Sequence, residues 1–355
     1  MTGAATSPTA LRRPWLARWQ TRHTQCMVVA TPVAILLLTG SDPSPAALAV
    51  MLALGGGVLG VPHGALDHLL GRALLAPRWG RWWPAVLFPA YLALASSVLV
   101  AWQVAPVATL LLFLAATALH FGTGDVEAAP PSTTTTRASR PRPAGALPWI
   151  YVLEVGVRGT VMLIVMAWRF PAELAQGIGW TLPAGAVTQA VLDAWVRAAA
   201  ARGIAVLVPA LAVVAVHCGV AAVRHRDPDR ALTIAELAAL SLLFARVPPI
   251  PAFVVYFCFW HSARHVLRVA ATLDPFDARR GLVGFAWHAL PLTAVTLVAM
   301  AVAWRSLATP AAPLATTTRV VFQGLSALTF PHIVITAISA RRGAWLAGPA
   351  AARGH

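Results

Sequence analysis

Lysine is absent from this sequence of 355 residues, so the 27 residues counted as Lys and Arg are all arginine. A retinal protein of the rhodopsin type binds its chromophore as a Schiff base on a lysine amine, which this chain cannot supply. Charged residues of both signs are also scarce, at 11% of the chain, while 58% of the residues are hydrophobic. Because soluble domains carry about 25% charged residues, this composition indicates a polytopic membrane protein.

Acidic residues are especially few, which leaves a formal net charge of +15. In a soluble protein such an excess would suggest a nucleic-acid partner. Here the arginines lie in short segments between apolar runs, as in membrane proteins, so we expect contact with membrane lipid and none with nucleic acid. The three cysteines, Cys26, Cys218 and Cys258, are widely spaced and form no CxxC pattern. We interpret them as packing residues rather than a disulfide framework.

Long apolar runs dominate the rest of the chain. A membrane-spanning helix needs about 20 mostly apolar residues. Ten stretches qualify, some of them marginally: 26–41, 46–68, 84–104, 106–122, 148–168, 203–223, 231–247, 251–271, 283–304 and 319–340. The first is short and the fourth is interrupted by His120, so nine spans are the alternative. We predict an all-α fold with a single transmembrane domain over residues 26–342.

The connections between these stretches predict the topology. Arginines cluster before the first stretch and after the second, fourth, sixth, eighth and tenth, whereas the alternate connections carry few. By the positive-inside rule this pattern fits ten helices with both termini in the cytoplasm. We therefore expect a multi-pass protein of the inner (plasma) membrane.

Four segments outside the spans have their own character. Residues 1–25 form a basic N-terminal arm, which we predict to be cytoplasmic, and residues 343–355 form a C-terminal tail. Residues 128–148 are rich in Pro, Thr and Arg, which predicts a disordered cytoplasmic loop. Residues 171–202 are moderately apolar and are interpreted as a helix on the outer surface.

Histidines inside the apolar runs are the candidates for chemistry. His261 and His265 are four residues apart, so on a helix they share one face and can hold one metal ion. The topology predicted from the arginines places His63 and His120 on the same side of the membrane as His261 and His265, and at a similar depth. Ionisable groups at this depth are costly and usually functional. Taken singly, however, a membrane histidine more often hydrogen-bonds a neighbouring helix than binds a metal.

Nearby carboxylates are candidates for supporting these histidines. Asp67 follows His63 by four residues and Asp125 follows His120 by five. A carboxylate that accepts the second imidazole N–H fixes the tautomer of a metal-bound histidine, although either Asp can equally be solvated at the membrane boundary. Glu154 with Arg158 is interpreted as a structural ion pair.

The other histidines have no assigned role. His68 is expected at the headgroup level. Three further histidines lie inside apolar runs, where they can line the cavity or support the ligands. They are His217, His288 and His332.

The donor set alone does not identify the metal. Imidazole suits iron, copper, zinc and nickel alike. A zinc protease normally has a glutamate beside its histidines, as in HExxH, but residue 262 is Ser. A membrane di-iron hydroxylase or desaturase needs several histidine boxes, and this chain has one HxxxH pair.

Four segments together resemble the Brp/Blh family of membrane β-carotene 15,15′-dioxygenases: GVPHGALD, LHFGTGD, FWHSARH and FPHIVI. They occur in that order, and the resemblance extends over roughly residues 46–340. It implies an iron-dependent membrane enzyme that splits β-carotene with O₂ at its central double bond and gives two all-trans-retinal. Carried over by position, it also implies the Fe(II) ligands His63, His120, His261 and His265. The departures from the family are the N-terminal arm and the insertion at 128–148.

The resemblance implies a lateral tunnel for a hydrocarbon substrate and an indirect link to a rhodopsin that uses the retinal. Aromatic residues are the candidates to line that tunnel, although such residues more often pack in the core or anchor the membrane interface: Trp149, Tyr151, Tyr256, Phe257, Trp260 and Trp287. The alternative functions are a non-haem iron hydroxylase of carotenoids or lipids, a non-catalytic accessory protein for a retinal protein, and a bis-histidine haem protein.

Overall fold

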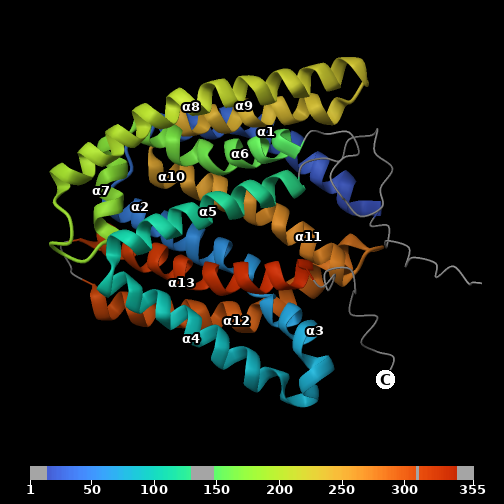
Figure 1. Cartoon of the computed structure of the whole chain (residues 1–355). Helices are drawn as coiled ribbons and strands as arrows, with labels where there is room; N and C mark the ends of the chain where they lie inside the picture. Colours follow the sequence, from blue (N-terminus) through green and yellow to red (C-terminus); the bar gives the residue numbers. More distant parts are fainter. Residues whose placement is uncertain (1–13, 129–147, 309–311, 342–355) are drawn as a thin grey trace, which may run out of the picture.

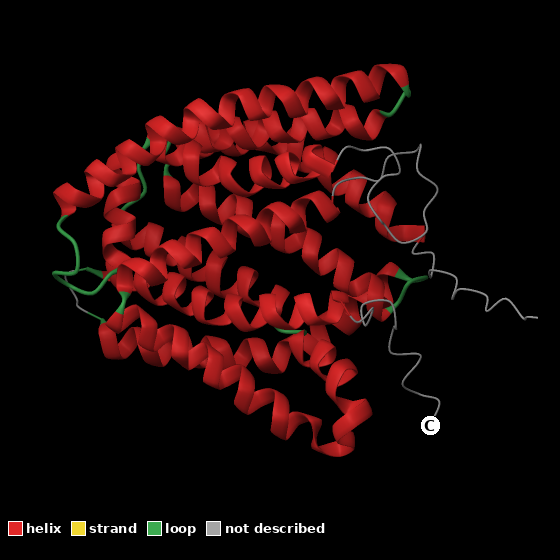
Figure 2. Cartoon of the chain, in the orientation of Figure 1, coloured by secondary structure: helices red, strands yellow, loops and turns green. Residues whose placement is uncertain are grey.

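The chain folds into a bundle of helices (Figure 1). The structure, a computed structural model, describes residues 14–128, 148–308 and 312–341. Over these residues it contains helices and connecting turns and no strand (Figure 2), which confirms the all-α fold class. The α-helices are α1 (Pro14–Thr39), α2 (Pro45–Leu52), α3 (Asp67–Trp79), α4 (Trp83–Val104), α5 (Pro106–Ala128), α6 (Pro148–Arg169), α7 (Pro171–Thr181), α8 (Gln189–Arg224), α9 (Pro228–Arg246), α10 (Pro249–Val254), α11 (Ala263–Leu273), α12 (Ala278–Leu307) and α13 (Pro313–Arg341).

The outer surface of the bundle is apolar, as a lipid solvent requires. Large hydrophobic side chains such as Leu36, Val104 and Val223 are more than two-thirds exposed. Seven helical segments in the described part of the chain are long and apolar enough to cross a membrane: 15–39, 67–104, 106–128, 149–169, 189–224, 278–307 and 313–339. The protein is therefore a membrane protein, while the predicted count of ten spans is not confirmed.

Three of the ten predicted spans are absent from that set, and two of them are broken helices. The stretch 46–68 divides into α2, the π-helix η1 (Ala53–Gly60), the 3₁₀ turn η2 (Val61–Gly64) and the start of α3. The stretch 251–271 divides into α10, the π-helix η4 (Val255–Ser262) and α11. The third, 231–247, is the single helix α9. A short 3₁₀ turn, η3 (Gly80–Trp82), joins α3 to α4.

The two π-helices pack directly against each other. Glycine makes this possible: a Cβ atom at Gly55 would overlap the side chain of Val254, and one at Gly60 would overlap the ring of Phe257. The Cys258 thiol also lies 3.0 Å from the carbonyl oxygen of Gly55. π-Helical turns often occur at functional sites; here η1 directly precedes the turn that carries His63, and η4 itself carries His261.

Of the N-terminal arm predicted for residues 1–25, residues 1–13 lie outside the described part of the chain, and the rest is helical. Residues 14–25 belong to α1, where Trp15 is 3% exposed and Thr24 is fully buried. The Trp15 indole N–H donates to the carbonyl oxygen of Asp274, 3.1 Å away, which fixes the start of α1 beside the turn between α11 and α12. The arginines of this segment masked its amphipathic pattern in the sequence.

The segment predicted as a surface helix over 171–202 also differs. It contains α7, a short turn and the first part of α8, which is 36 residues long and begins well before the predicted residue 203. The predicted disordered loop at 128–148 lies almost wholly outside the described residues, and so does the C-terminal tail at 343–355.

Candidate functional site

Four histidine rings from four helical elements, α5, η4, α11 and α13, form a chain inside the bundle. His120 on α5 lies with its ring centroid 5.2 Å from that of His261 on η4 and 5.2 Å from that of His332 on α13. The His332 and His265 centroids are 5.6 Å apart. His261, His265 and His332 are each at most 5% exposed. The structure thus brings together three of the four predicted ligands and adds His332.

His63 is the remaining predicted ligand. Its backbone lies in η2, but the structure does not describe its side chain. The position of η2 is nevertheless informative, because a Cβ atom at Gly64 would lie 3.9 Å from Nδ1 of His332. The backbone next to His63 therefore borders the histidine cluster.

Two matching hydrogen-bond chains hold the cluster. The Nδ1 of His332 lies 2.7 Å from Oδ1 of Asp67, while the Tyr91 hydroxyl donates to Oδ2 of the same carboxylate at 3.0 Å. In the second chain, Nδ1 of His261 lies 3.4 Å from Oδ1 of Asp125. The Tyr256 hydroxyl donates to Oδ2 of Asp125 at 2.7 Å. An ionised carboxylate only accepts hydrogen bonds, so in each chain the imidazole donates its proton from Nδ1 and carries its lone pair on Nε2.

The two carboxylates therefore support different histidines from those nearest in sequence. Asp67 is bonded to His332, 265 residues away, and Asp125 to His261, 136 residues away. Both carboxylates are buried, so neither is solvated at the membrane boundary.

His332 is the member of the cluster that the sequence analysis did not include among the predicted ligands. Its segment, FPHIVI, is one of the four on which the family resemblance rests, and its Pro–His pair repeats the Pro62–His63 pair. That repetition was the available signal. The other histidines lie outside the cluster: His217 and His288 are exposed on α8 and α12, and Nδ1 of His68 bonds the Ala65 carbonyl 3.0 Å away.

A buried ion-pair network lies behind the segment that carries His261 and His265. Glu236 on α9 accepts a hydrogen bond from the Trp260 indole at 3.0 Å and one from the Arg264 guanidinium. The same carboxylate lies 3.1 Å from Nη1 of Arg158, whose Nε bonds Glu154 at 3.1 Å. The predicted Glu154–Arg158 pair is therefore confirmed as part of a larger network. Because Trp260 and Arg264 each precede a histidine of the cluster, the network fixes the orientation of that helix.

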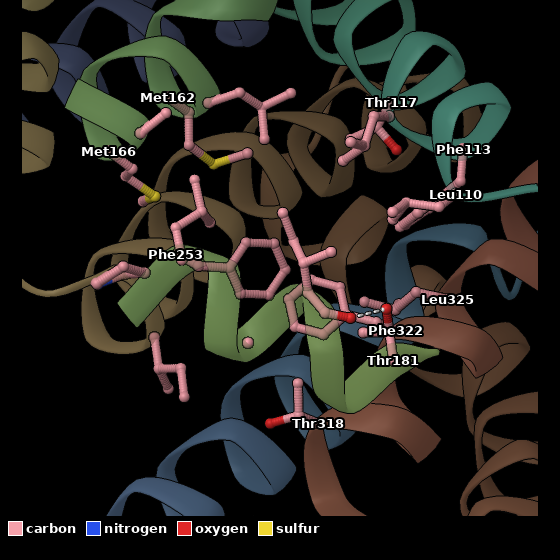
Figure 3. Close-up of a pocket in the computed structure, with 18 of the residues that line it drawn as sticks. Leu110, Phe113, Thr117, Met162, Met166, Thr181, Phe253, Thr318, Phe322 and Leu325 are labelled. Atoms are coloured by element: carbon pink, nitrogen blue, oxygen red, sulfur yellow. Dashed lines mark hydrogen bonds between the residues drawn. The ribbon is translucent and has the colours of Figure 1, made fainter. Parts of the chain in front are cut away.

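An apolar cavity of about 350 Å³ begins at the histidine cluster. His120, Phe121 and Phe257 line the end nearest the cluster, and the wall continues between α5, α6, α7, α10 and α13. Figure 3 shows Met162 and Met166 on the opposite side of the cavity from Leu110, Phe113 and Thr117. The rings of Phe253 and Phe322 meet within it, with centroids 5.0 Å apart. A site of this kind suits a hydrocarbon.

Phe257 is the one residue among the six predicted to line a tunnel that lines this cavity. Trp149, Tyr151 and Trp287 are exposed on the outer surface, with Trp287 70% exposed. Tyr256 and Trp260 are buried on the other face of η4, where they bond Asp125 and Glu236. The sequence could not show which of these residues face the cavity, because a π-helix does not follow the usual helical periodicity.

Histidine side chains are suitable ligands for a transition metal, although the imidazole nitrogen atoms of this cluster do not all lie within bonding distance of a single ion position. Among the side chains that the structure describes, no three from His, Cys, Asp and Glu meet in metal-binding geometry. The nearest ring centroids nevertheless lie 5.2 Å apart. Two imidazoles bound to one ion at roughly 2.1 Å have their centroids about 5 Å apart. The spacing of neighbouring rings in the cluster is therefore close to that of two imidazoles that share one ion.

Fold and site together define a helical membrane protein with a buried histidine cluster at the end of an apolar cavity. The model of the family described as Beta-carotene 15,15'-dioxygenase matches residues 54–338, and the chain belongs to that family. It is 32% identical to a protein of Halobacterium salinarum named "Probable beta-carotene 15,15'-dioxygenase Blh" over 320 residues, which cover 86% of this chain and 89% of that protein.

A second relative extends the comparison. The chain is 25% identical to the "Beta-carotene 15,15'-dioxygenase" of an uncultured marine bacterium, 66A03, over 279 residues, which cover 78% of this chain and 88% of the relative. No solved structure matches the chain.

Proposed function

We propose that this chain cleaves β-carotene with O₂ at the central 15,15′ double bond and gives two molecules of retinal. The observation that carries the proposal is the double role of His120, which belongs both to the histidine cluster and to the wall of the apolar cavity. A hydrocarbon in the cavity is therefore next to the candidate metal ligands. Family membership and the names of both relatives support the same reaction.

We further propose that the cluster holds a ferrous ion. The ligands would be His120, His261 and His265, together with His332 and with His63, whose backbone borders them. When bound, such an ion supplies the oxygen chemistry that amino-acid side chains lack. A set made of neutral imidazoles suits iron and does not resemble the thiolate sites of structural zinc or iron–sulfur clusters.

The surrounding residues orient the ligands and exclude water. Asp67 and Asp125 keep a proton on Nδ1 of His332 and His261 and so direct each Nε2 into the cluster. The Tyr91 and Tyr256 hydroxyls fix the two carboxylates in turn. Phe121 and Phe257 close the cavity around the reacting bond, which keeps water from the aldehydes as they form.

The reaction balances without a further reductant. The central carbon–carbon double bond breaks, each of its two carbons forms a double bond to one atom of the same O₂ molecule, and no proton is gained or lost. A hydroxylase would instead reduce one oxygen atom to water and leave the carbon skeleton whole. Product analysis therefore distinguishes these alternatives.

The membrane both holds the protein and supplies its substrate. β-Carotene dissolves in lipid, so an enzyme with an apolar surface and an internal apolar cavity takes its substrate from the bilayer. We place the protein in the inner (plasma) membrane. Without lysine the chain cannot retain retinal as a Schiff base, and the product is free to reach a rhodopsin in the same cell.

The test is expression of the whole chain in a bacterium that produces β-carotene, followed by chromatography of the extracted pigments and iron analysis of the purified protein. Variants His261→Ala and His332→Ala are compared with His288→Ala, whose exposed ring bonds only its own helix at Gly284 among the described contacts. We expect the parent and His288→Ala to convert β-carotene into twice its amount of retinal.

The two cluster variants should lose iron and activity together. A product that keeps the whole carbon skeleton and carries added hydroxyl groups would show that the protein is a hydroxylase and not a cleaving dioxygenase. If β-carotene persists unchanged although the protein is folded and iron-loaded, the proposed function is wrong and the accessory role is favoured.

A further inference from the structure

The cavity runs along one face of α5, away from the histidine cluster. Its lining residues on this helix recur at helical spacing, and they are Leu110, Phe113, Leu114, Thr117, His120 and Phe121. The ten residues from Leu110 to His120 correspond to about 15 Å at 1.5 Å per residue. The cavity is therefore a channel with the histidines at one end, and Figure 3 shows its wall from Leu110 to Thr117.

Along α5, the channel ends at a compact group of buried side chains, whereas Glu173 on α7 and Ala199 on α8, which also line it, are exposed. Trp102 has no exposed surface and donates its indole N–H to the Ser326 hydroxyl at 2.7 Å. It packs with Leu110, Phe113 and Val196 in one core cluster, and all four also line the cavity. A long ligand that enters beside the histidines therefore stops at this wall.

The size of the channel matches half of the proposed substrate. One half of β-carotene, from the central bond to the far edge of its ring, measures about 14 Å if bonds of roughly 1.4 Å advance a zigzag chain by about 1.2 Å each. The volume of about 350 Å³ lies at the lower end of the range of about 300–1,000 Å³ for sites that hold one compact small molecule. It can contain a twenty-carbon half but not the whole forty-carbon chain.

Gly177 on α7 is the position at which the channel can be shortened. It lines the cavity, and a Cβ atom built on it meets no other atom within 4 Å. Its neighbours Leu174 and Ile178 pack against the core cluster at which the channel ends along α5. A side chain at position 177, which is half-buried, therefore meets open space beside the channel and would narrow the channel from the α7 side.

We propose that this channel is the binding site for one twenty-carbon half of the carotenoid. The absence of a side chain at Gly177 sets its length, so that the central double bond stops at the histidine cluster. This inference rests on the proposed function and adds to it the origin of central cleavage. A shorter channel admits less than half of the chain, and an off-centre double bond then reaches the histidines. The same balanced cleavage gives one aldehyde shorter than retinal and one longer.

The experiment compares Gly177→Ala, Gly177→Leu and Gly177→Phe with the control Gly156→Leu. Gly156 is also a helical glycine whose added Cβ meets nothing, but it is exposed on α6 and does not line the cavity. Products are identified by chromatography and mass spectrometry. In a second measurement, each substitution is placed in a His261→Ala background, and the retinal retained by the purified, iron-free protein is measured by absorbance.

We expect the parent and Gly156→Leu to give retinal alone. The Gly177 series should give a growing share of unequal aldehydes as the side chain enlarges, and the Phe variant should retain about tenfold less retinal, which corresponds to about 1.4 kcal/mol of binding free energy. Retinal as sole product in all three variants, with unchanged retention, would overturn the channel assignment. If the Phe variant does not fold, the Ala and Leu variants decide the question. A parent that gives no retinal contradicts the proposed function instead, and the retention measurement still tests the channel.

Discussion

The histidine cluster depends on residues that do not themselves point at the proposed ion. Each of two histidines is held through Nδ1 by a carboxylate, and each carboxylate receives a tyrosine hydroxyl. Orientation by such partners typically changes metal affinity or activity by 10–100-fold. The shorter of the two imidazole contacts, 2.7 Å between His332 and Asp67, marks the stronger support.

Asp67→Asn should therefore lower the iron affinity of the purified protein by about 10–100-fold, because an amide no longer holds the proton on Nδ1 of His332. Tyr91→Phe should cause a smaller loss, since it removes one hydrogen bond to the carboxylate and leaves the His332 contact in place. Iron titration of the metal-free variants measures both effects. Glu127→Gln is the control, because Glu127 is an exposed carboxylate whose ion pair is with Arg268. Equal iron affinity in Asp67→Asn and the parent would contradict the assigned role.

At the scale of the element, the two π-helices are the part of the fold that positions the site. They cross where glycines in η1 face larger side chains in η4. A methyl group at Gly60 would overlap the Phe257 ring, whereas one at Gly57 would meet Leu297 at an ordinary 3.5 Å. The two glycines are three residues apart in the same segment and thus form a matched pair.

Gly60→Ala should destabilise the protein by about 1–3 kcal/mol, the usual cost of overpacking a filled core. Gly57→Ala should be neutral or slightly stabilising, because it removes backbone freedom from the unfolded chain without a clash. Thermal unfolding in detergent measures both. The double variant Gly60→Ala with Phe257→Leu should recover part of the loss, since the smaller side chain vacates the overlapped space. A Gly60→Ala protein as stable as the Gly57→Ala protein would show that the crossing is looser than described.

The sequence predicted the regular helices well and the broken ones poorly. The spans expected at 84–104 and 148–168 match α4 and α6 to within one residue at each end, because prolines and apolar runs mark them locally. The breaks at η1 and η4 depend on contacts between segments about 200 residues apart, which no local pattern encodes. The partners of Asp67 and Asp125 were missed for the same reason. The alternation of apolar runs and arginines predicted a similar depth for His120, His261 and His265, and the structure brings these three rings into one cluster.

At the scale of the whole molecule, buried charge ties the helices together. Glu236 on α9 contacts Arg158 on α6 and Arg264 on α11, and Arg264 donates to Thr24 on α1 at 2.8 Å. The side chain of Glu236 has no exposed surface. Such a network adds little net stability compared with an apolar core, but removing one partner leaves the others charged and buried.

Glu236→Gln should therefore cost about 3–5 kcal/mol, because two guanidinium groups lose their shared carboxylate. Glu127→Gln, at an exposed pair with Arg268, should cost less than about 1 kcal/mol. Unfolding in detergent compares the two variants, and iron content reports whether η4 and α11 keep their orientation. A loss of stability in Glu236→Gln no larger than that in Glu127→Gln would mean that water or another cation reaches the network.

The first and the last described helices share one end of the bundle. Helix α1 begins and α13 ends at the same end of the bundle, and the connections between α3 and α4, between α8 and α9 and between α11 and α12 lie at that end too (Figure 1). Those connections carry arginine clusters such as Arg78 with Arg81 and Arg279 with Arg280. The turn between α7 and α8 lies at the opposite end and carries no charged residue over 182–188. A start of α1 and an end of α13 on one side fit an even number of membrane crossings; ten is one such number, and the count itself stays a prediction.

We accordingly predict that both termini are cytoplasmic and that the turn at 182–188 faces outward. A reporter that fluoresces only in the cytoplasm, fused to either terminus, should be bright. The same reporter inserted at Gly185, in an exposed turn with positive φ, should be dark, while an enzyme reporter that is active only outside the cytoplasm should work there. Opposite results at the two termini would require an odd number of crossings. In that case one of the broken segments, α2 with η1 or α10 with η4, would enter and leave the membrane on the same side, and the histidine cluster would be built on a re-entrant element.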